Sequence, residues 1–152
     1  LVDTTADPAQ VAQGIAPPGA QVLPYPDDPA GLGKIAVIRR EPDRDQLLRL
    51  GPLVERHDRF PERTNVQLVR VDAPSEVTVA VWERGAGETL SSGTSSVAVA
   101  GAAVAQGWCE SPVTVHLAGG DLVVHLDEAM NARLVGPAQE ICRLELSEEL
   151  EL

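Results

Sequence analysis

Aromatic side chains are scarce in this 152-residue chain. Trp, Tyr and Phe together make up only 3% of it, whereas the apolar fraction of 43% is ordinary. The core must therefore be built from Val, Leu, Ile and Ala, a mixture that favours strands together with an Ala-rich helix. A chain of this length can form one domain with a substantial core but is short for two. We expect residues 1–152 to form a single domain.

Long apolar runs and clustered positive charge are also lacking. No stretch approaches the roughly 20 apolar residues that cross a bilayer. The longest run of small and apolar residues, 97–105, lies in mid-chain, where a signal peptide does not occur. The net charge of −11 argues against nucleic acid, because phosphate contacts need clustered Lys and Arg. We expect a soluble protein with neither a membrane nor a nucleic acid as partner.

Cysteine is limited to Cys109 and Cys142. The two form no CxxC pair and have no His at metal-ligand spacing, so no metal site is expected. Both are predicted to be small core residues. Unpaired thiols suit a reducing cytoplasm, which is the expected location. No phosphate loop of the GxxxxGK[ST] type is present, and the sequence indicates no cofactor.

The N-terminal part of the chain differs in composition from the rest. Residues 1–34 are rich in Pro, Gly, Ala and Asp, which predicts an irregular lead-in with one short helix near residues 8–14. Beyond it, Asp43 or Asp45 is suited to cap a second helix. Pro52 is expected to interrupt and restart that helix.

Alternation of apolar and polar residues predicts strands in the remainder. The clearest case is residues 76–83, where Val77, Val79 and Val81 share one face. Gly119 and Gly120 are predicted to join two strands as a hairpin. The expected strands are residues 34–40, 65–72, 76–83, 113–117, 121–126, 132–135 and 141–146.

A third helix is expected over residues 97–106, which are apolar or small on every side. The serine-rich stretch 91–96 before it suits an N-cap, and Gly107 suits the position after its end. A helix that is apolar all round must be buried. We therefore predict an α+β fold in which a mostly antiparallel sheet curls around a central buried helix.

The residues best suited to bind a ligand lie just before this helix. Glu83 and Arg84 end a predicted strand, and a Gly-rich loop leads from them toward the helix start. A carboxylate beside a guanidinium matches the ammonium and carboxylate of an amino acid. The helix-start amides near Gly93 and Thr94 suit an anion. Adjacent Glu-Arg pairs are also common as surface charge, and the residues alone leave both interpretations open.

Two segments resemble the motifs of a known family. ERGAGETLSSGT, residues 83–94, resembles the ERGxGETxACGTG signature of the diaminopimelate epimerases, and FPERTNVQLV, residues 60–69, resembles their FPERxNVxFV segment. The hairpin at residues 119–120 and the Gly-Pro-Ala turn at residues 136–138 are similar to the end of that family. The resemblance covers roughly residues 35–150.

The resemblance implies one half of a two-domain enzyme. Each half of the family is a sheet curled around a central helix, and the active site lies between the halves. This chain would be the C-terminal half of a cofactor-independent amino-acid epimerase that converts LL- to meso-diaminopimelate for lysine and peptidoglycan synthesis. Its partners would be the N-terminal half and the amino-acid substrate, with a homodimer as a further option. The isolated chain is expected to be inactive.

The resemblance also assigns roles to individual residues. Asn65 would hydrogen-bond the substrate, Glu83 and Arg84 would hold its amino and carboxylate groups, and Gly93 and Thr94 would supply helix-start amides. The list of candidate site residues is completed by Ser92, which stands where the family has its second catalytic cysteine.

Ser92 is a departure with chemical consequences. A thiol has a pKa of about 8.5, whereas an unactivated hydroxyl lies near the ~15.7 of water. About seven units correspond to on the order of 10 kcal/mol, and a helix N-terminus returns only about 0.3–2 kcal/mol. Ser92 is therefore not expected to be the base, although it could donate a proton, orient water or cap the helix. A one-thiol dehydratase and a non-catalytic amino-acid-binding or scaffold domain remain alternative functions.

A second departure lies upstream. The family's GNPH segment, whose Asn contacts substrate, should fall near Lys34, and no Asn or His stands there. Lys34 could recognise an anionic group or be solvated.

Overall fold

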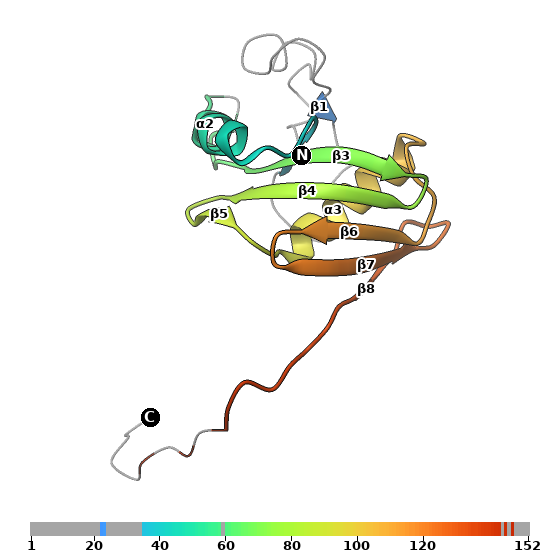
Figure 1. The fold of residues 1–152 in the computed structure, drawn as a ribbon. Coiled ribbons are helices and arrows are strands. Elements are labelled where there is room, and N and C mark those ends of the chain that lie inside the picture. The colour runs from blue at the N-terminus through green and yellow to red at the C-terminus, as the bar shows by residue number, and fades with distance from the viewer. Residues whose placement is uncertain (1–21, 24–34, 59, 144, 146, 148–152) are drawn as a thin grey trace.

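The structure is a computed structural model that describes residues 22–23, 35–58, 60–143, 145 and 147. These residues contain one sheet of eight strands and two helices. The strand order is β1-β2-β3-β4-β6-β7-β8, and β5 pairs with β4. The β2–β3 and β4–β6 pairs are parallel, and the other pairs are antiparallel. The elements in chain order (Figure 1) are β1 (Val22–Leu23), β2 (Ile35–Arg39), α2 (Arg44–Glu55), β3 (Asn65–Ala73), β4 (Glu76–Glu83), β5 (Gly87–Thr89), α3 (Gly93–Ala105), β6 (Val113–Leu117), β7 (Gly120–Leu126) and β8 (Ala132–Val135).

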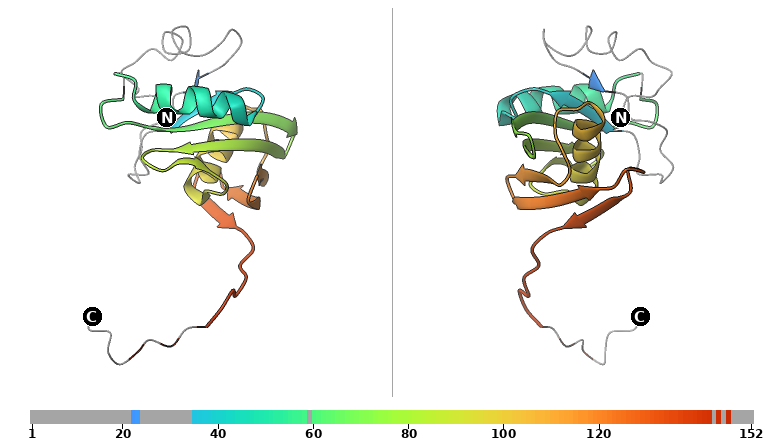
Figure 2. Two further views of the ribbon diagram at one scale, coloured as in Figure 1. Left: turned by 60° about the vertical axis from the view of Figure 1, so that its left-hand side comes forward. Right: turned by 90° about the vertical axis from the view of Figure 1, so that its right-hand side faces the viewer.

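The sheet curls around α3. This helix contacts β2 and β3 on one side of the strand order and β6, β7 and β8 on the other, which a flat sheet would not allow. Figure 2 shows α3 inside the curl and α2 on the outer side. The predicted α+β fold, a mostly antiparallel sheet around a central buried helix, is confirmed.

Successive residues of the central strands point into two different cores. On β4, Val77, Val79 and Val81 pack with α3, whereas Ala80 and Trp82 pack with α2. This is the period-two alternation of a strand that is covered on both faces. Odd-numbered residues of β4 therefore direct their side chains toward α3, and even-numbered residues direct theirs toward the α2 side of the sheet.

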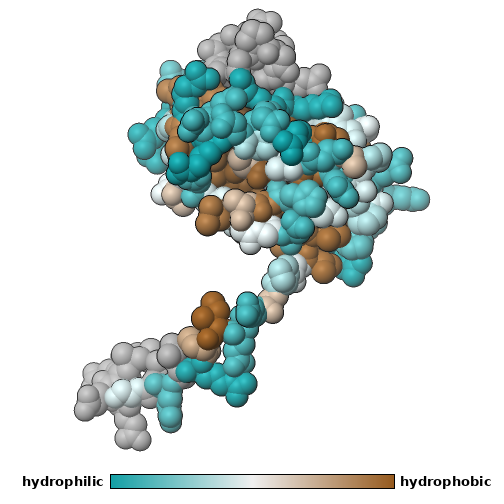
Figure 3. All heavy atoms as spheres, in the orientation of Figure 1, coloured by the Kyte–Doolittle hydropathy of each residue, from teal (hydrophilic) through white to brown (hydrophobic). Residues whose placement is uncertain are grey.

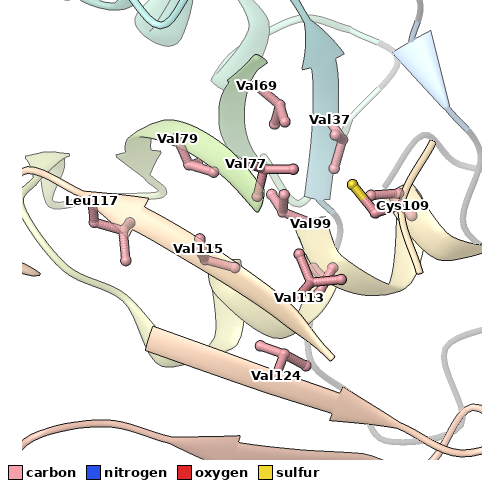
Figure 4. Packing of buried hydrophobic residues seen from close by; sticks show 14 of the residues in the cluster. Val37, Val69, Val77, Val79, Val99, Cys109, Val113, Val115, Leu117 and Val124 are labelled. Carbon is pink, nitrogen blue, oxygen red and sulfur yellow. The ribbon is translucent and has the colours of Figure 1, made fainter. Parts of the chain in front are cut away.

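The core around α3 is built almost entirely from small aliphatic side chains, as the scarcity of aromatics predicts. Figure 4 shows Val99 of α3 among Val69, Val77, Val113 and other strand valines. The α2 core uses larger side chains and includes Phe60, Leu47, Leu50 and Ile38.

Helix α2 is continuous, so the expected restart at Pro52 is wrong. Asp43 is the N-cap, and its carboxylate accepts hydrogen bonds from the amides of Asp45 and Gln46, both at 3.3 Å. Pro52 removes the hydrogen bond to the carbonyl of Leu48. Leu48 and Leu53 are exposed, so this side of the helix faces water, which can satisfy that carbonyl.

The predictions for the two ends of the chain have mixed outcomes. In the lead-in, Val22–Leu23 forms the short strand β1, whereas the helix expected over residues 8–14 and Lys34 lie outside the described residues. At the other end, residues 141–143 and 145 belong to no strand, so the strand expected over residues 141–146 is wrong for them. After β8 the chain runs away from the sheet (Figure 1), and no neighbouring strand pairs with its described part.

The two cysteines also differ. Cys109 is buried after α3, as predicted. Cys142 is exposed, so its assignment to the core is wrong, and the adjacent Ile141 is 94% exposed. The segment that carries Ile141 and Cys142 has nothing to pack against among the described residues.

Neither helix of the described part of the chain combines the length and apolarity that crossing a membrane requires.

His116 lies between two carboxylates on the β6–β7 hairpin. Its Nδ1 is 2.9 Å from Oδ1 of Asp121, its cross-strand partner, and its Nε2 is 3.7 Å from Oε2 of Glu76 on β4. The hydrogen bond with Asp121 and the charges of both carboxylates raise the pKa of His116 above its usual value, against the opposing effect of burial. The protonated ring is therefore favoured in the folded state.

This arrangement makes part of the stability dependent on pH. A raised pKa contributes stability that is fully present below the unfolded value of about 6.5 and is lost as pH rises through the folded value. We expect the free energy of unfolding of the unmodified chain to exceed that of His116→Gln at about pH 5.5, with a difference that shrinks toward about pH 9. Urea unfolding across this range measures it, with His125→Gln as control. A difference independent of pH would contradict the assignment.

Candidate functional site

The candidate site forms where the end of β4 meets the start of α3. Because odd-numbered residues of β4 face α3, Glu83 points toward that helix. The hydroxyl of Ser92 donates to Oε1 of Glu83 at 2.5 Å. Ser92 is also the N-cap of α3, and its Oγ accepts from the amide of Ser95 at 3.4 Å. One buried hydroxyl thus connects the Glu83 carboxylate to the first turn of the helix.

The first turn of α3 offers backbone amides to a ligand. The first amides of a helix have no intrahelical acceptor. Ser92 satisfies those of Ser95 and Ser96 through its Oγ and carbonyl, which leaves the amides of Gly93 and Thr94 suited to an anion. A Cβ on Gly93 would lie 2.9 Å from Cδ2 of Leu134 on β8, so a side chain there would have to displace the end of the Leu134 side chain.

Asn65 lies beside Glu83 and Arg84 because of the β3–β4 register, which pairs Val66 with Trp82. Its Oδ1 accepts a hydrogen bond from the backbone amide of Arg84 at 2.7 Å. The oxygen is therefore occupied, and the side-chain NH₂ group is the part that can donate to a ligand. Asn65 therefore fixes the backbone at Arg84, in addition to the hydrogen bond to substrate that is predicted for it.

Arg84 is exposed at the end of β4. Its Nη1 donates to the carbonyl of Glu62 at 2.9 Å, and the remaining guanidinium N–H groups can bind a carboxylate. Glu62 belongs to a tight turn in which the amide of Arg63 bonds the carbonyl of Phe60 at 2.7 Å. Since Phe60 is anchored in the α2 core, this turn fixes the start of β3 and hence Asn65.

The predicted site residues lie close together and come from three elements. Ser92, Gly93 and Thr94 come from the start of α3, Glu83 and Arg84 from the end of β4, and Asn65 from the start of β3. Two hydrogen bonds connect the groups, from Ser92 to Glu83 and from the Arg84 amide to Asn65.

Sequence reasoning missed Glu55, the last residue of α2. It is 2% exposed, and its Oε2 accepts from Nε1 of Trp82 at 2.7 Å while its Oε1 accepts from the amide of Gly85 at 3.1 Å. Nη1 of Arg63 lies 3.5 Å from Oε1. A signal existed, because Glu55 continues the buried stripe of α2 that contains Leu47, Leu50, Gly51 and Val54.

The pKa of Glu55 reflects these contacts. Burial acts to raise it, but the hydrogen bonds from Trp82 and Gly85, with the charges of Arg63 and Arg56, lower it below the ordinary value. The carboxylate is therefore held in its charged form.

Trp82 was missed as well. A Cβ on Gly51 would lie 2.5 Å from two atoms of the indole ring, so only glycine lets α2 approach the ring this closely. On the other side the ring lies near Gly87 of β5. Trp82 is thus packed between α2 and the short strand that follows the Gly-rich loop, a strand that the sequence did not predict.

Comparison with known proteins identifies the family. A family model described as "Diaminopimelate epimerase" matches residues 29–141. The chain belongs to the diaminopimelate epimerase family. It is 46% identical over 101 residues to the diaminopimelate epimerase of Desulfitobacterium hafniense and 48% identical over 105 residues to that of Heliobacterium modesticaldum. The match to the Bacillus cereus enzyme is 43% over 103 residues.

These relatives are much longer than the matched part. The alignments cover 66%, 68% and 66% of this chain but only 36%, 37% and 36% of the respective relatives. The chain therefore spans little more than a third of their length.

A solved structure supports the fold. The Bacillus anthracis phenazine biosynthesis protein of the PhzF family matches with a TM-score of 0.52 over 76% of this chain and 37% of that one. At 13% identity the likeness concerns the fold alone.

The role of Ser92 as N-cap gives a stability prediction. Ser92→Ala removes the oxygen that accepts from the Ser95 amide, and loss of an N-cap side chain costs about 1 kcal/mol. We expect the free energy of unfolding to fall by at least about that amount, because Glu83 loses its hydrogen-bond donor in the same variant. Denaturant titration measures the difference. Ser91→Ala, at the exposed neighbouring position, should stay within about 0.5 kcal/mol of the unmodified chain. Equal losses in both variants would show that Ser92 is not the cap.

Proposed function

We propose that this chain supplies the C-terminal half of the active site of a cofactor-independent amino-acid epimerase whose substrate is diaminopimelate. The observation that carries the proposal is the Glu83–Ser92 contact at the start of α3, beside the Asn65–Arg84 pair. Together these groups provide a carboxylate, a guanidinium and helix-start amides within one neighbourhood.

Each group has a chemical role toward an α-amino acid. The amides of Gly93 and Thr94 and the guanidinium of Arg84 would bind the carboxylate, which also stabilises the charge that develops when the α-proton leaves. Glu83 would accept hydrogen bonds from the ammonium, and the NH₂ group of Asn65 would donate to a substrate oxygen. No step of this scheme uses a metal or an organic cofactor.

The missing thiol would come from an N-terminal half-domain that covers the site. Epimerisation needs one group to remove the α-proton and another to deliver a proton on the opposite face. Ser92 is a poor base for the first task, since the gap of about seven pKa units between hydroxyl and thiol far exceeds what a helix N-terminus offsets. This half would bind and orient the substrate, and the Ser92 hydroxyl would relay a proton from water to the opposite face of the substrate. The hydroxide formed would be neutralised by the proton left on the thiol of the other half.

The surface near the site supports such a cover. Leu90, just before α3, is 61% exposed, and Leu134, in contact distance of Gly93, is 41% exposed, followed by Val135 at 45%. Figure 3 shows a largely hydrophilic surface in which apolar areas appear over the strands. Leu134, which lies beside Gly93, is the apolar side chain that such a cover would bury.

A second candidate is a non-catalytic amino-acid-binding domain of the same fold. The observation that favours it is the same 2.5 Å contact, because the hydroxyl of Ser92 occupies one oxygen of the carboxylate that would hold the ammonium. Such a domain would keep affinity for the amino acid without turnover. A one-thiol dehydratase is the remaining alternative and differs in its product.

Deuterium incorporation distinguishes these functions. With LL-diaminopimelate in deuterated water, a protein that joins this chain to the proposed N-terminal half-domain (here called the full-length protein) should place α-deuterium in both stereoisomers. Elimination would instead give a keto or imine product. The isolated 152-residue chain should show no turnover. Racemisation by the isolated chain would contradict the need for a second half.

A cysteine at position 92 tests the chemistry of this half directly. Ser92→Cys in the full-length protein should raise the epimerisation rate by orders of magnitude, because the thiolate is accessible near neutral pH. Ser91→Cys is the matched control and should leave the rate unchanged. If Ser92→Cys gives no gain and calorimetry detects no binding of diaminopimelate, the epimerase proposal is wrong.

A further inference from the structure

Glu55 is a carboxylate in a place where two effects oppose its charge. It is buried, and burying a charge without partners is costly. It is also the last residue of α2, where the helix dipole is negative, and the last turn of α2 holds no basic residue. A well-packed apolar side chain would serve stability as well or better. The contacts of the carboxylate must therefore explain its presence.

The two oxygens of Glu55 each accept from a different donor. Oε2 accepts from the indole of Trp82, and Oε1 accepts from the backbone amide of Gly85. Trp82 precedes Glu83, and Gly85 follows Arg84. The carboxylate therefore holds the chain on both sides of the two residues that are expected to contact substrate.

The amide of Arg84 is held from a different direction. Oδ1 of Asn65, at the start of β3, accepts from it at 2.7 Å. Two consecutive amides of the loop are thus bound by side chains of two separate elements, α2 and β3. A rotation of the peptide between Arg84 and Gly85 would break the hydrogen bond to Glu55.

We propose that Glu55 is a positioning residue of the site, which fixes the loop carrying Glu83 and Arg84 without contacting substrate itself. The identity of the ligand in this proposal rests on the proposed function, whereas the part concerning the loop rests on the hydrogen bonds of Glu55 alone. The two parts can be tested separately.

Glu55→Gln is the informative substitution because it keeps the size of the side chain. A carboxylate offers an acceptor oxygen to each donor, but an amide offers one oxygen and one NH₂ group. In the variant either the Trp82 indole or the Gly85 amide must face a donor. We expect the affinity of the full-length protein for meso-diaminopimelate to fall about tenfold or more, the scale of a lost hydrogen bond to a charged group.

A second substitution should restore part of this loss. Trp82→Phe keeps a ring between Gly51 and Gly87 but removes the indole donor. In Glu55→Gln/Trp82→Phe the single oxygen of Gln is free to accept from the Gly85 amide. We expect the double variant to bind more tightly than Glu55→Gln alone. Because Glu55 and Trp82 are in direct contact, the melting temperatures of these variants are expected to be non-additive whatever the role of Glu55. The recovery of affinity is the readout that a merely structural role would not give.

The loop itself can be followed without any ligand. In ¹H–¹⁵N spectra of the 152-residue chain, the Gly85 amide and the Trp82 indole should shift together on acid titration with one midpoint below the usual range of a Glu. Arg63 and Arg56 are the cations near this carboxylate. Both signals should lose this titration in Glu55→Gln and keep it in Glu41→Gln, a control at an exposed carboxylate.

The outcomes separate the two proposals. If the unmodified full-length protein does not bind meso-diaminopimelate but the joint titration is seen, the substrate is wrong and the positioning of the loop by Glu55 stands. If the titration is absent, or if Glu55→Gln lowers the melting temperature while affinity is unchanged, Glu55 is not a positioning residue.

Discussion

Helix α3 has no polar face, and the rest of the structure follows from the need to cover it. Its thirteen residues are small or apolar, so strands must reach it from several directions, and β2 and β8 near the two ends of the strand order both do. The sheet cannot do this without curling. The polar groups that remain are at the start of the helix, where amides without intrahelical acceptors must find side chains or a ligand. The site lies there because burial leaves this end as the place where α3 can meet polar groups.

Much of this arrangement could be predicted from periodicity and caps. The alternation of Val77, Val79 and Val81 predicts a face, and the face places Glu83 toward α3 once the helix is known to lie there. The serine-rich stretch 91–96 predicts an N-cap, which is Ser92, but α3 begins at Gly93 and ends at Ala105, so the helix expected over residues 97–106 starts about one turn too late. These signals lie within short stretches of sequence, because strand alternation and helix capping depend only on the local backbone.

Other features depend on contacts between distant segments. The Asn65–Arg84 hydrogen bond needs the β3–β4 register, and the Glu55–Gly85 hydrogen bond needs the packing of α2 on the sheet; neither is written in a short stretch of sequence. The errors at Ile141 and Cys142 arise because a predicted strand has no neighbour to pack against within the described part of the chain. Alternation indicates which side chains would share a face but not whether anything covers that face. At Pro52 the hydrogen bond lost from the helix lies on a water-facing side, so the interruption expected from proline does not occur.

The scarcity of aromatic residues has a practical consequence. The described residues contain two indoles in unlike surroundings: Trp82 donates to Glu55 beside the loop of the site, and Trp108, after the end of α3, lies with its ring 4.9 Å from the guanidinium carbon of Arg39. Emission from the first is sensitive to the electrostatics of a buried carboxylate, and emission from the second to a stacked cation. Replacing either indole with Phe would leave a chain whose ultraviolet fluorescence is dominated by one reporter, at the site or at the far end of the central helix.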